Sequence, residues 1–501
     1  MEKDRPSSFF PNRWLTTALI AVLFLAALAI RVYDITDLPN DFYMVRQYRS
    51  LLIARGMYYS HLSSVPQWQR QMAVAQWQEQ GLIEPPIMES VTALTYDVVG
   101  EHIWIGRLYG SLCWLLGGIA ILLLAREMSM RAGGILALAY FLFVPFGITA
   151  SRTFMPDPLM VAMIIWALWG LYHWEKQHTW KTAILAGVLT GLAIFVKSVA
   201  VFPLLGAAAG LVISRKSWKR ILADKQTWLV AGITAVPSIL YYIYGLAFAN
   251  MESQFSLRFF PSYWTDPSFY GRWLFMSAGF AGFAALFGAL VGILLFPSSG
   301  PRFMAIGLWV GYIIYGFVFP YHIITHDYYH LPILAIVAFG LIPLLDFVAR
   351  QLLDKQGRLW RFAFAGLLLF GVGMQMWGAR NTAVVNNYRP EIPYWQALGK
   401  LIGHDKKAIE VSGDYGSRLE YFGWVNPAYW PSVADTNVRL LAGEKQPDFA
   451  SEFAAETAGM DLFVVTSMPE LNNQPELRDY LAAHFPVIAK GDGYLIYNLK
   501  P

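Results

Sequence analysis

A short polar stretch follows the first long apolar run of the chain, and it carries residue types suited to proton transfer. Asp34, Asp37 and Asp41 come first, and Arg46 follows shortly after them. A carboxylate within hydrogen-bond reach of a hydroxyl group can act as a general base. The stretch comes where a membrane helix should reach the surface, so a carboxylate there could meet a lipid head group and a water-borne molecule together. We choose Asp41 as the base.

Three further polar clusters stand near the ends of apolar segments, and a cation interrupts one of those segments. The clusters contain Glu84, Arg152, Asp157, His326, Tyr328 and Tyr329. Lys197 lies within an apolar run, where a lysine is costly unless it pairs with an acid or reaches an anionic head group. Fixed cations stabilise a phosphate on which charge develops as a bond breaks. Lys197 and Arg152 suit that task.

Each of these residues also has a structural alternative. Arg152 could anchor a helix end by extending its side chain to the membrane interface. Asp157 stands between two prolines and could cap the helix that follows it. Lys197 could reach the interface without binding any ligand.

The histidines His322, His326 and His330 are spaced to share one helical face, which is the spacing a metal site would use. Histidines beside tyrosines also serve as interfacial anchors or hydrogen-bond donors. No cofactor is required by the sequence, and a divalent cation is the one cofactor left open.

The composition is that of a membrane protein. Of the 501 residues, 56% are hydrophobic and only 14% are charged, whereas about a quarter of a soluble chain is charged. The net charge of +4 is small and scattered, so no nucleic-acid partner is expected.

Apolar segments of membrane-spanning length predict a mainly α, polytopic membrane helix bundle with about eleven spans. A long first loop, residues 34–102, separates the first two spans. It should contain surface amphipathic helices over 48–59 and 65–80, and a partial helix over 86–99. The expected spans cover 14–30, 103–125, 132–149, 158–174, 182–196, 199–213, 228–248, 273–296, 303–320, 331–349 and 362–378.

Lysine and arginine gather in alternate connections, which predicts the orientation of the chain. The basic connections lie near residues 126–131, 176–181, 215–225, 302 and 350–361. With a cytoplasmic N-terminus, the first loop and the tail fall on the extracytoplasmic side.

The tail has a different composition and predicts a small extracytoplasmic α/β domain. Strands are expected over 408–411, 462–465 and 494–497, and helices over 394–401 and 475–484. The domains would therefore be a transmembrane domain over 1–389, with the catalytic loop at 34–102, and the tail domain over 390–501.

Several motifs, in this order, resemble the dolichyl-phosphate-mannose protein mannosyltransferase family and its bacterial relatives, which include aminoarabinose transferases. All are C-type, polyprenyl-phosphate-sugar-dependent glycosyltransferases. Where the family usually has an Asp-Glu pair in the first loop, this chain has Asn40-Asp41. The other motifs are Glu84-Pro85-Pro86, Gly106-Arg107-Leu108, Phe154-Met155-Pro156-Asp157, Gly191-Leu192-Ala193 before Lys197, and His326-Asp327-Tyr328-Tyr329-His330-Leu331-Pro332.

The resemblance implies an enzyme that transfers a sugar, with inversion, from a polyprenyl-phosphate donor in the lipid bilayer to an extracytoplasmic acceptor. The acceptor would be a protein hydroxyl, a lipid or a surface glycan. The compact loops favour a bacterial cytoplasmic membrane, with the active site on its extracytoplasmic face. The implied roles are catalysis by Asp41 and Asp157, donor-phosphate binding by Lys197, Arg152 and His326, and substrate contact by Glu84, Arg46, Tyr328 and Tyr329.

A secondary transporter or flippase for lipid-linked substrates is the alternative. Transporters tend to place ionisable residues near the bilayer midplane, often within two related halves. Here the ionisable residues stand mainly at segment ends, and no related halves are visible in the sequence, so the transferase is preferred.

Overall fold

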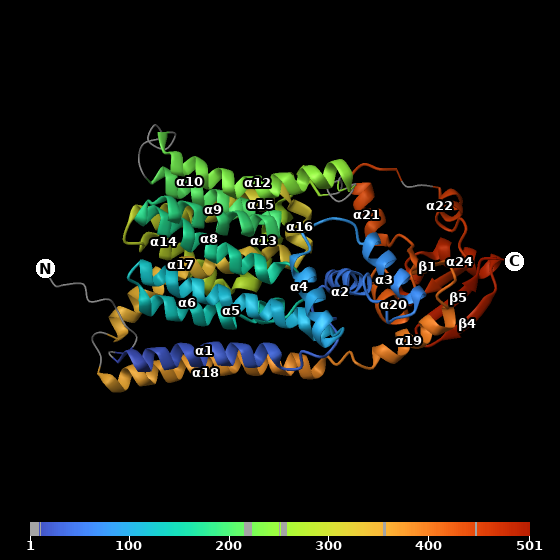
Figure 1. Cartoon of the computed structure of the whole chain (residues 1–501), viewed down its shortest axis with the longest axis horizontal. Helices are drawn as coiled ribbons and strands as arrows, with labels where there is room; N and C mark the ends of the chain where they lie inside the picture. Colours follow the sequence, from blue (N-terminus) through green and yellow to red (C-terminus); the bar gives the residue numbers. More distant parts are fainter. Residues whose placement is uncertain are drawn as a thin grey trace. The chain divides into compact units, whose positions relative to one another are not determined.

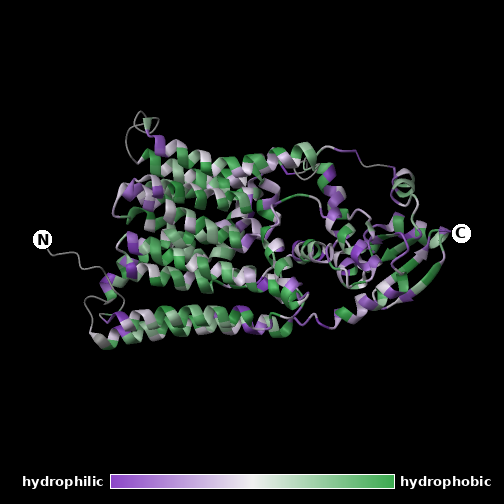
Figure 2. Ribbon diagram, in the orientation of Figure 1, coloured by the Kyte–Doolittle hydropathy of each residue, from purple (hydrophilic) through white to green (hydrophobic). Residues whose placement is uncertain are grey.

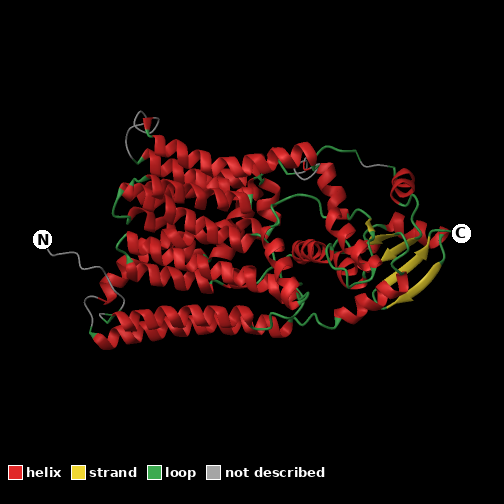
Figure 3. Cartoon of the chain, in the orientation of Figure 1, coloured by secondary structure: helices red, strands yellow, loops and turns green. Residues whose placement is uncertain are grey.

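The computed structural model describes residues 10, 12–214, 223–249, 251, 258–353, 357–445 and 448–500. The described chain is mainly helical and has one five-stranded sheet (Figures 1 and 3). It forms two compact units. Unit 1 comprises residues 1–36, 82–87 and 104–386, and unit 2 comprises 37–81, 88–103 and 387–501. Most of the first loop and the tail together therefore form unit 2.

Long apolar helices make up unit 1, and Figure 2 shows hydrophobic residues along most of their length. One break in this run lies at Lys197: α9 (Trp180–Val196) ends just before it, and η1 (Ser198–Ala200) and α10 (Val201–Ile213) follow it. The elements are α1 (Arg13–Val32), α5 (Ile103–Glu127), α6 (Arg131–Phe143), α7 (Pro145–Ser151), α8 (Asp157–Gln177), α9 (Trp180–Val196), η1 (Ser198–Ala200), α10 (Val201–Ile213), α12 (Lys225–Phe248), η3 (Pro261–Thr265), α13 (Pro267–Ala281), α14 (Phe283–Leu294), α15 (Ser299–Val318), α16 (Pro320–Thr325), η4 (Asp327–His330), α17 (Leu331–Leu353) and α18 (Arg358–Val385).

Every predicted span has a helix or a bent helix pair as its counterpart, but the count of eleven is not confirmed. Among the described residues, six helices are long and apolar enough to cross a membrane, or up to eight if each bent pair is one span. The chain is therefore a multi-pass membrane protein. The bent pairs are α6–α7, with a bend of 62°, and α13–α14, with a bend of 93°. Parts of two predicted basic connections, at 215–222 and 354–356, lie outside the described residues.

Two helices of unit 1, α10 and α15, pack with their backbones in direct contact. A Cβ atom on Gly206 would lie 2.0 Å from the carbonyl oxygen of Gly307, and one on Gly210 would lie 2.0 Å from that of Phe303. A Cβ on Gly311 would lie 2.1 Å from the carbonyl oxygen of Phe202. Small residues four apart allow membrane helices to approach in this way. Because α10 begins just after Lys197, this contact fixes the chain next to the lysine.

Unit 2 combines the helices of the first loop with the tail. The loop supplies α2 (Met44–Tyr59), α3 (Gln67–Glu79) and α4 (Ile87–Val99). The tail supplies α19 (Glu391–Ile402), β1 (Ala408–Val411), α20 (Ser417–Gly423), β2 (Ala428–Tyr429), α21 (Val433–Leu441), α22 (Phe449–Glu456), β3 (Leu462–Val465), α23 (Met468–Asn472), α24 (Pro475–His484), β4 (Val487–Gly491) and β5 (Tyr494–Asn498).

The sheet of unit 2 has the strand order β2-β1-β3-β5-β4. The first three strands are parallel, and β5 pairs antiparallel with both β3 and β4. Buried apolar side chains of β1 and β3, including Ile409 and Phe463, pack with Trp430 and Phe453 in the core. The predicted strands at 408–411, 462–465 and 494–497 are confirmed, as are the helices at 394–401 and 475–484.

The first-loop helices form where predicted, but α2 is not a surface helix. Nine of its residues are buried, and it packs against α3 and the tail helix α20. Arg55 of α2 donates to the backbone oxygen of Tyr421 at 2.6 Å and pairs with Glu101 at 2.8 Å. The loop is thus part of the folded core of unit 2.

Candidate active site

Lys197 stands at a break between two apolar helices, where its backbone is extended (φ −156°, ψ 118°). Its N–H bonds back to the carbonyl of Ala193, and η1 begins at the next residue. The lysine is therefore presented from a helix end rather than from a helix face. The predicted break in this apolar stretch is confirmed.

The ammonium group of Lys197 meets two carboxylates. It donates to both oxygens of Asp157, at 2.8 and 2.9 Å, and its Nζ atom lies 3.9 Å from Oε1 of Glu84. The Lys197 Nζ atom also lies 4.7 Å from the centroid of the Tyr328 ring, a cation–π contact. We call these four residues, Glu84, Asp157, Lys197 and Tyr328, the lysine cluster. All belong to unit 1.

The charged side chains of this cluster are buried, which makes their charges costly in free energy. The side chains of Lys197, Asp157 and Glu84 are 9%, 1% and 11% exposed. Removing charged groups from water costs several kcal/mol per ion unless they are paired. Two acids and one lysine leave the cluster with a formal charge of −1. Protonation of one of the two acids, or a second basic side chain nearby, would balance this charge.

Asp157 is the first residue of α8 but does not cap it, because the N-cap is Pro156 and no side-chain cap is present. Its carboxylate is instead directed to Lys197. A negative charge in the first turn of a helix is also stabilised by the helix dipole. The capping alternative is therefore wrong, because both carboxylate oxygens of Asp157 accept from Lys197.

An aromatic layer adjoins the cluster. Tyr328 and Tyr329 of η4 lie 4.9 Å apart between ring centroids, and Tyr329 stacks on His322 at 5.0 Å. His326 packs edge-on against Tyr328 at 5.7 Å. Burial, followed by the nearby His326 and Arg258, lowers the pKa of His322 to about 3. His322 is therefore neutral at physiological pH.

The predicted three-histidine face does not form. His330 is buried, with Nε2 2.6 Å from the carbonyl oxygen of Ile323 and Nδ1 2.7 Å from the Tyr312 hydroxyl. Both ring nitrogens of His330 are therefore engaged in hydrogen bonds within the protein. Among the residues that the structure describes, no group of three His, Cys, Asp or Glu side chains could hold a metal ion. The described His, Cys, Asp and Glu side chains therefore do not fit a metal ion.

Arg152 is committed, at least in part, to the scaffold of unit 1. Its Nη2 donates to the backbone oxygen of Tyr33 at 2.7 Å, and its own carbonyl accepts from Nε of Arg107 at 3.0 Å. Arg152 is only 5% exposed, so it is not a surface anchor. It holds the end of α1 against the segment that leads to Asp157.

Asp41 lies in unit 2, on a loop held by buried side chains. Gln47 donates to the carbonyls of Pro39 and Phe42, and the Tyr48 hydroxyl donates to Asn40. Asp41 itself is partly exposed. Because its neighbours are fixed, its carboxylate is held on a rigid support.

The other acids of this loop differ in their surroundings. Asp37 is buried and accepts hydrogen bonds from the backbone N–H of Tyr388, at 3.1 and 3.2 Å. It therefore joins the loop to the tail. Burial, and then the nearby Asp41, raises the pKa of Tyr388. Arg46 is the third residue of α2, five residues after Asp41.

Two residues near the lysine cluster were missed by the sequence reasoning. Tyr242 of α12 hydrogen-bonds to Ser198, next to Lys197, and interacts electrostatically with both Glu84 and Arg258. Arg258 is thus a second cation on this side of unit 1. Arg258 lies in a connection predicted to be extracytoplasmic, where the charge pattern of the chain predicts few cations. This exception could have identified Arg258 as a candidate site residue from the sequence.

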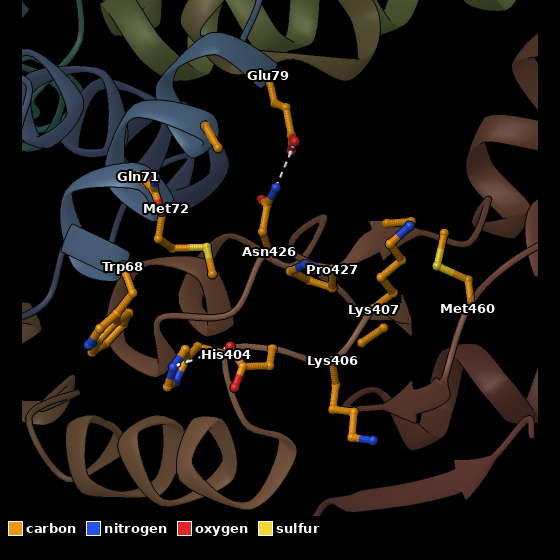
Figure 4. A pocket seen from close by; sticks show the side chains of 14 residues that line it. Trp68, Gln71, Met72, Glu79, His404, Lys406, Lys407, Asn426, Pro427 and Met460 are labelled. Carbon is orange, nitrogen blue, oxygen red and sulfur yellow. Dashed lines mark hydrogen bonds and ion pairs between the residues drawn. The ribbon is translucent and has the colours of Figure 1, made fainter.

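Unit 2 contains a hollow of about 730 Å³ between α3 and the tail (Figure 4). Trp68 and His404 stack on one side of it, with centroids 4.2 Å apart and planes at 19°. On another side, Asn426 donates to Glu79 at 2.6 Å, and Lys407 contributes a basic side chain to the lining. The hollow therefore combines an aromatic surface with hydrogen-bonding groups of both kinds. We call it the tryptophan hollow.

The comparisons with known proteins bear on this architecture. Residues 83–244 match the sequence model of the family described as dolichyl-phosphate-mannose-protein mannosyltransferase. Glu84, Asp157 and Lys197 all fall within the matched part. Among curated proteins, no sequence matches the chain significantly.

Solved structures match over nearly the whole chain. ArnT from Cupriavidus metallidurans bound to undecaprenyl phosphate has a TM-score of 0.60 at 16% identity, covering 97% of this chain and 98% of that one. An oligosaccharyltransferase from Archaeoglobus fulgidus, in complex with Zn and sulfate, has a TM-score of 0.53 at 14% identity, covering 89% and 68%. AglB from the same organism, in complex with an inhibitory peptide and a dolichol-phosphate, has a TM-score of 0.52 at 12% identity, covering 92% and 70%.

The resemblance inferred from the motifs is therefore confirmed at the level of fold. This chain is a multi-pass membrane protein that shares the fold of these ArnT and oligosaccharyltransferase structures, and its residues 83–244 match the model of the family described as dolichyl-phosphate-mannose-protein mannosyltransferase.

Proposed function

We propose that the chain transfers a sugar, with inversion, from a polyprenyl-phosphate donor to an extracytoplasmic acceptor. The observation that carries this proposal is the lysine cluster, a buried ammonium group held by Asp157. A buried cation at a helix break in a membrane protein is a candidate ligand for an anionic group. The proposed setting is a bacterial cytoplasmic membrane, with the reaction on its extracytoplasmic face.

The reaction balances as one displacement at the anomeric carbon. The acceptor hydroxyl gives its proton to the Asp41 carboxylate while its oxygen bonds to the anomeric carbon. The bond from that carbon to the phosphate oxygen breaks, and polyprenyl phosphate leaves with the electron pair. Because attack and departure occur on opposite sides, the anomeric configuration inverts.

Lys197 is suited to the leaving phosphate because of how its three N–H groups are used. Two are directed to Asp157, whereas Glu84 lies at 3.9 Å, beyond ordinary hydrogen-bond distance. The third N–H can therefore donate to a phosphate oxygen while Asp157 holds the lysine in place. Asp157 thus acts in catalysis by orienting Lys197. Arg152 and His326 are proposed as additional phosphate donors.

The remaining predicted residues are assigned to substrate contact. Tyr328 and Tyr329 would offer ring faces to the sugar or the lipid, and Glu84 and Arg46 would bind hydroxyl or charged groups. We further assign the tryptophan hollow of unit 2 to a sugar unit of the acceptor. Its volume lies in the range of ligand sites, and Trp68 offers an apolar ring beside donors and acceptors suited to hydroxyl groups.

Transport of a lipid-linked substrate is not favoured. Transporters are often built from two related halves, and no related halves are visible in this sequence.

The test is a transfer assay on the purified full-length chain in lipid nanodiscs. A panel of polyprenyl-phosphate sugars would be supplied with candidate acceptors, and release of polyprenyl phosphate would be measured with and without added divalent cation. We expect release with at least one donor, lost in Lys197→Met and retained in Lys181→Met, which removes an exposed lysine elsewhere in unit 1. Movement of intact donor across a bilayer, with no release, would refute the proposal.

A further inference from the structure

A second hollow lies in unit 1, where four apolar segments end. Its volume is about 580 Å³, and it is lined by the end of α5, the start of α6, the segment after α14 and the last turns of α17. Both α5 and α17 are long enough to span a membrane, and α6 and α14 belong to the two bent pairs. The hollow therefore lies where membrane helices meet the head-group region.

Three arginines surround this arginine hollow: Arg126, Arg131 and Arg350. Arg350 is held in place, because it donates to Asp346 at 2.7 Å and to the backbone oxygen of Ser129 at 3.2 Å. Asp346 in turn accepts from the N–H of Gly133 at 3.1 Å. Three arginines and one acid give the lining a formal charge of +2.

The other two arginines are available to a ligand. Arg126 and Arg131 are exposed, and neither side chain forms a hydrogen bond or ion pair with any residue that the structure describes. The nearest acid in sequence, Glu127, is paired with His173 at 2.6 Å and lies 3.7 Å from Lys176. No neighbouring acid among the described residues therefore neutralises Arg126 or Arg131.

The start of α6 adds a further feature that favours an anion. The N-cap is Met130, which provides no side-chain hydrogen bond. In the first turn, the N–H of Gly133 donates to Asp346, and the positive end of the helix dipole favours further negative charge beside it. Arg131 is the first residue of this helix, so its side chain and the helix start act on the same region.

Apolar residues complete the lining. Leu295, Pro297 and Pro343 contribute apolar surface, and Phe347 is 50% exposed beside them. An inorganic anion would need only the arginines, whereas a lipid would use both surfaces. Basic pockets between membrane helices on the cytoplasmic side bind anionic lipid head groups, and the basic connections of this chain predict that side here.

We propose that the arginine hollow binds the phosphodiester head group of an anionic glycerophospholipid. The arginines and the start of α6 would contact the phosphate, and Phe347 and Leu295 would contact the glycerol and upper acyl chains. The hollow takes no part in the proposed transfer reaction, so the inference stands apart from it.

The experiment titrates phosphatidylglycerol, and separately phosphatidylcholine, into the full-length chain in neutral detergent. Bound lipid would be counted by native mass spectrometry, and stabilisation followed by thermal unfolding. The test variant is Arg126→Gln/Arg131→Gln, which changes two exposed side chains that form no hydrogen bond or ion pair with the residues that the structure describes. The matched control, Lys181→Gln/Lys225→Gln, removes the same charge from exposed positions outside the hollow.

We expect phosphatidylglycerol to bind and stabilise the wild type and the control more strongly than phosphatidylcholine does. The test variant should lose affinity about tenfold or more, since each cation near the surface is worth roughly fivefold. Equal loss in test and control variants would show a diffuse charge effect and overturn the site. Equal protection by soluble glycerol 3-phosphate would show a free phosphate ligand and overturn the lipid assignment.

Discussion

Removing one member of the buried ion cluster tests the proposed role of Lys197 most directly. At 2.8 Å and an effective dielectric constant near 20, the attraction between Lys197 and Asp157 is about 6 kcal/mol. At 3.9 Å the attraction to Glu84 is about 4 kcal/mol on the same basis. Desolvation offsets much of both terms, so the net contribution of the cluster to stability is small. Breaking it is what costs free energy.

The two single variants should therefore differ. Asp157→Asn leaves Lys197 with Glu84 as a substitute partner, so we expect a loss of roughly 1–3 kcal/mol in unfolding free energy. Lys197→Met leaves two buried acids without their cation, and we expect the larger loss, about 3–5 kcal/mol. The double variant Asp157→Asn/Lys197→Met should recover part of that loss, because only Glu84 is then left to protonate.

Transfer should follow a different order from stability. Any variant without Lys197 should lose about a hundredfold or more in kcat, typical of removing a group that stabilises developing charge, and the double variant should stay inactive even where its stability recovers. Thermal unfolding and polyprenyl phosphate release, measured on the same nanodisc samples, separate the two effects. The reasoning would be refuted if the double variant were no more stable than Lys197→Met, or if it regained transfer.

Three further outcomes follow from the same structure. Asp41→Asn should lower kcat by a factor of about 10²–10⁴ and retain donor binding, whereas Asp34→Asn should have little effect on either. Both variants would be measured for donor binding and for release of polyprenyl phosphate. Unchanged transfer in Asp41→Asn would remove Asp41 from the mechanism. Trp68→Ala should raise KM for a glycan acceptor with little change in kcat or in donor binding, and an unchanged KM would remove the acceptor assignment from the hollow. Burial, and then the nearby Asp414, raises the pKa of Glu410 to about 8. Because this folded-state pKa lies above the unfolded value, the free energy of unfolding should fall as the pH rises from about 4.5 to about 8. The slope should reach up to ~1.4 kcal/mol per pH unit. Thermal unfolding of Glu410→Gln across this range should show a flatter dependence on pH, and a slope equal to that of the wild type would contradict the assignment.

Local pattern predicted much of the fold. The apolar segments, the break at Lys197 and the tail helix at Pro475–His484 are each determined by residues close in sequence. Two strands were not predicted because they lack such a local pattern. The strand β2 has only two residues, and β4 is largely exposed, so neither shows an alternation of buried and exposed side chains. Their places depend on pairing with β1 and β5.

The site was less predictable, because it depends on side chains far apart in the chain. The sequence indicated that Lys197 needs an anionic partner, but not that Asp157, forty residues away, would occupy two of its N–H groups. It likewise indicated acids in the first loop without distinguishing them. Asp37 is bound to the backbone of Tyr388, 351 residues away, and only the structure separates it from Asp41.

The glycine contact between α10 and α15 has a consequence for how variants should be interpreted. Each of Gly206, Gly210, Gly307 and Gly311 meets a neighbouring backbone too closely to admit a methyl group. An alanine at any of them would have to force the two helices apart, and the displacement would extend a few residues along α10 to Lys197. A loss of turnover in such a variant would therefore report a shifted ammonium group rather than a missing functional group. The same backbone contacts leave α10 and α15 little freedom to move relative to each other.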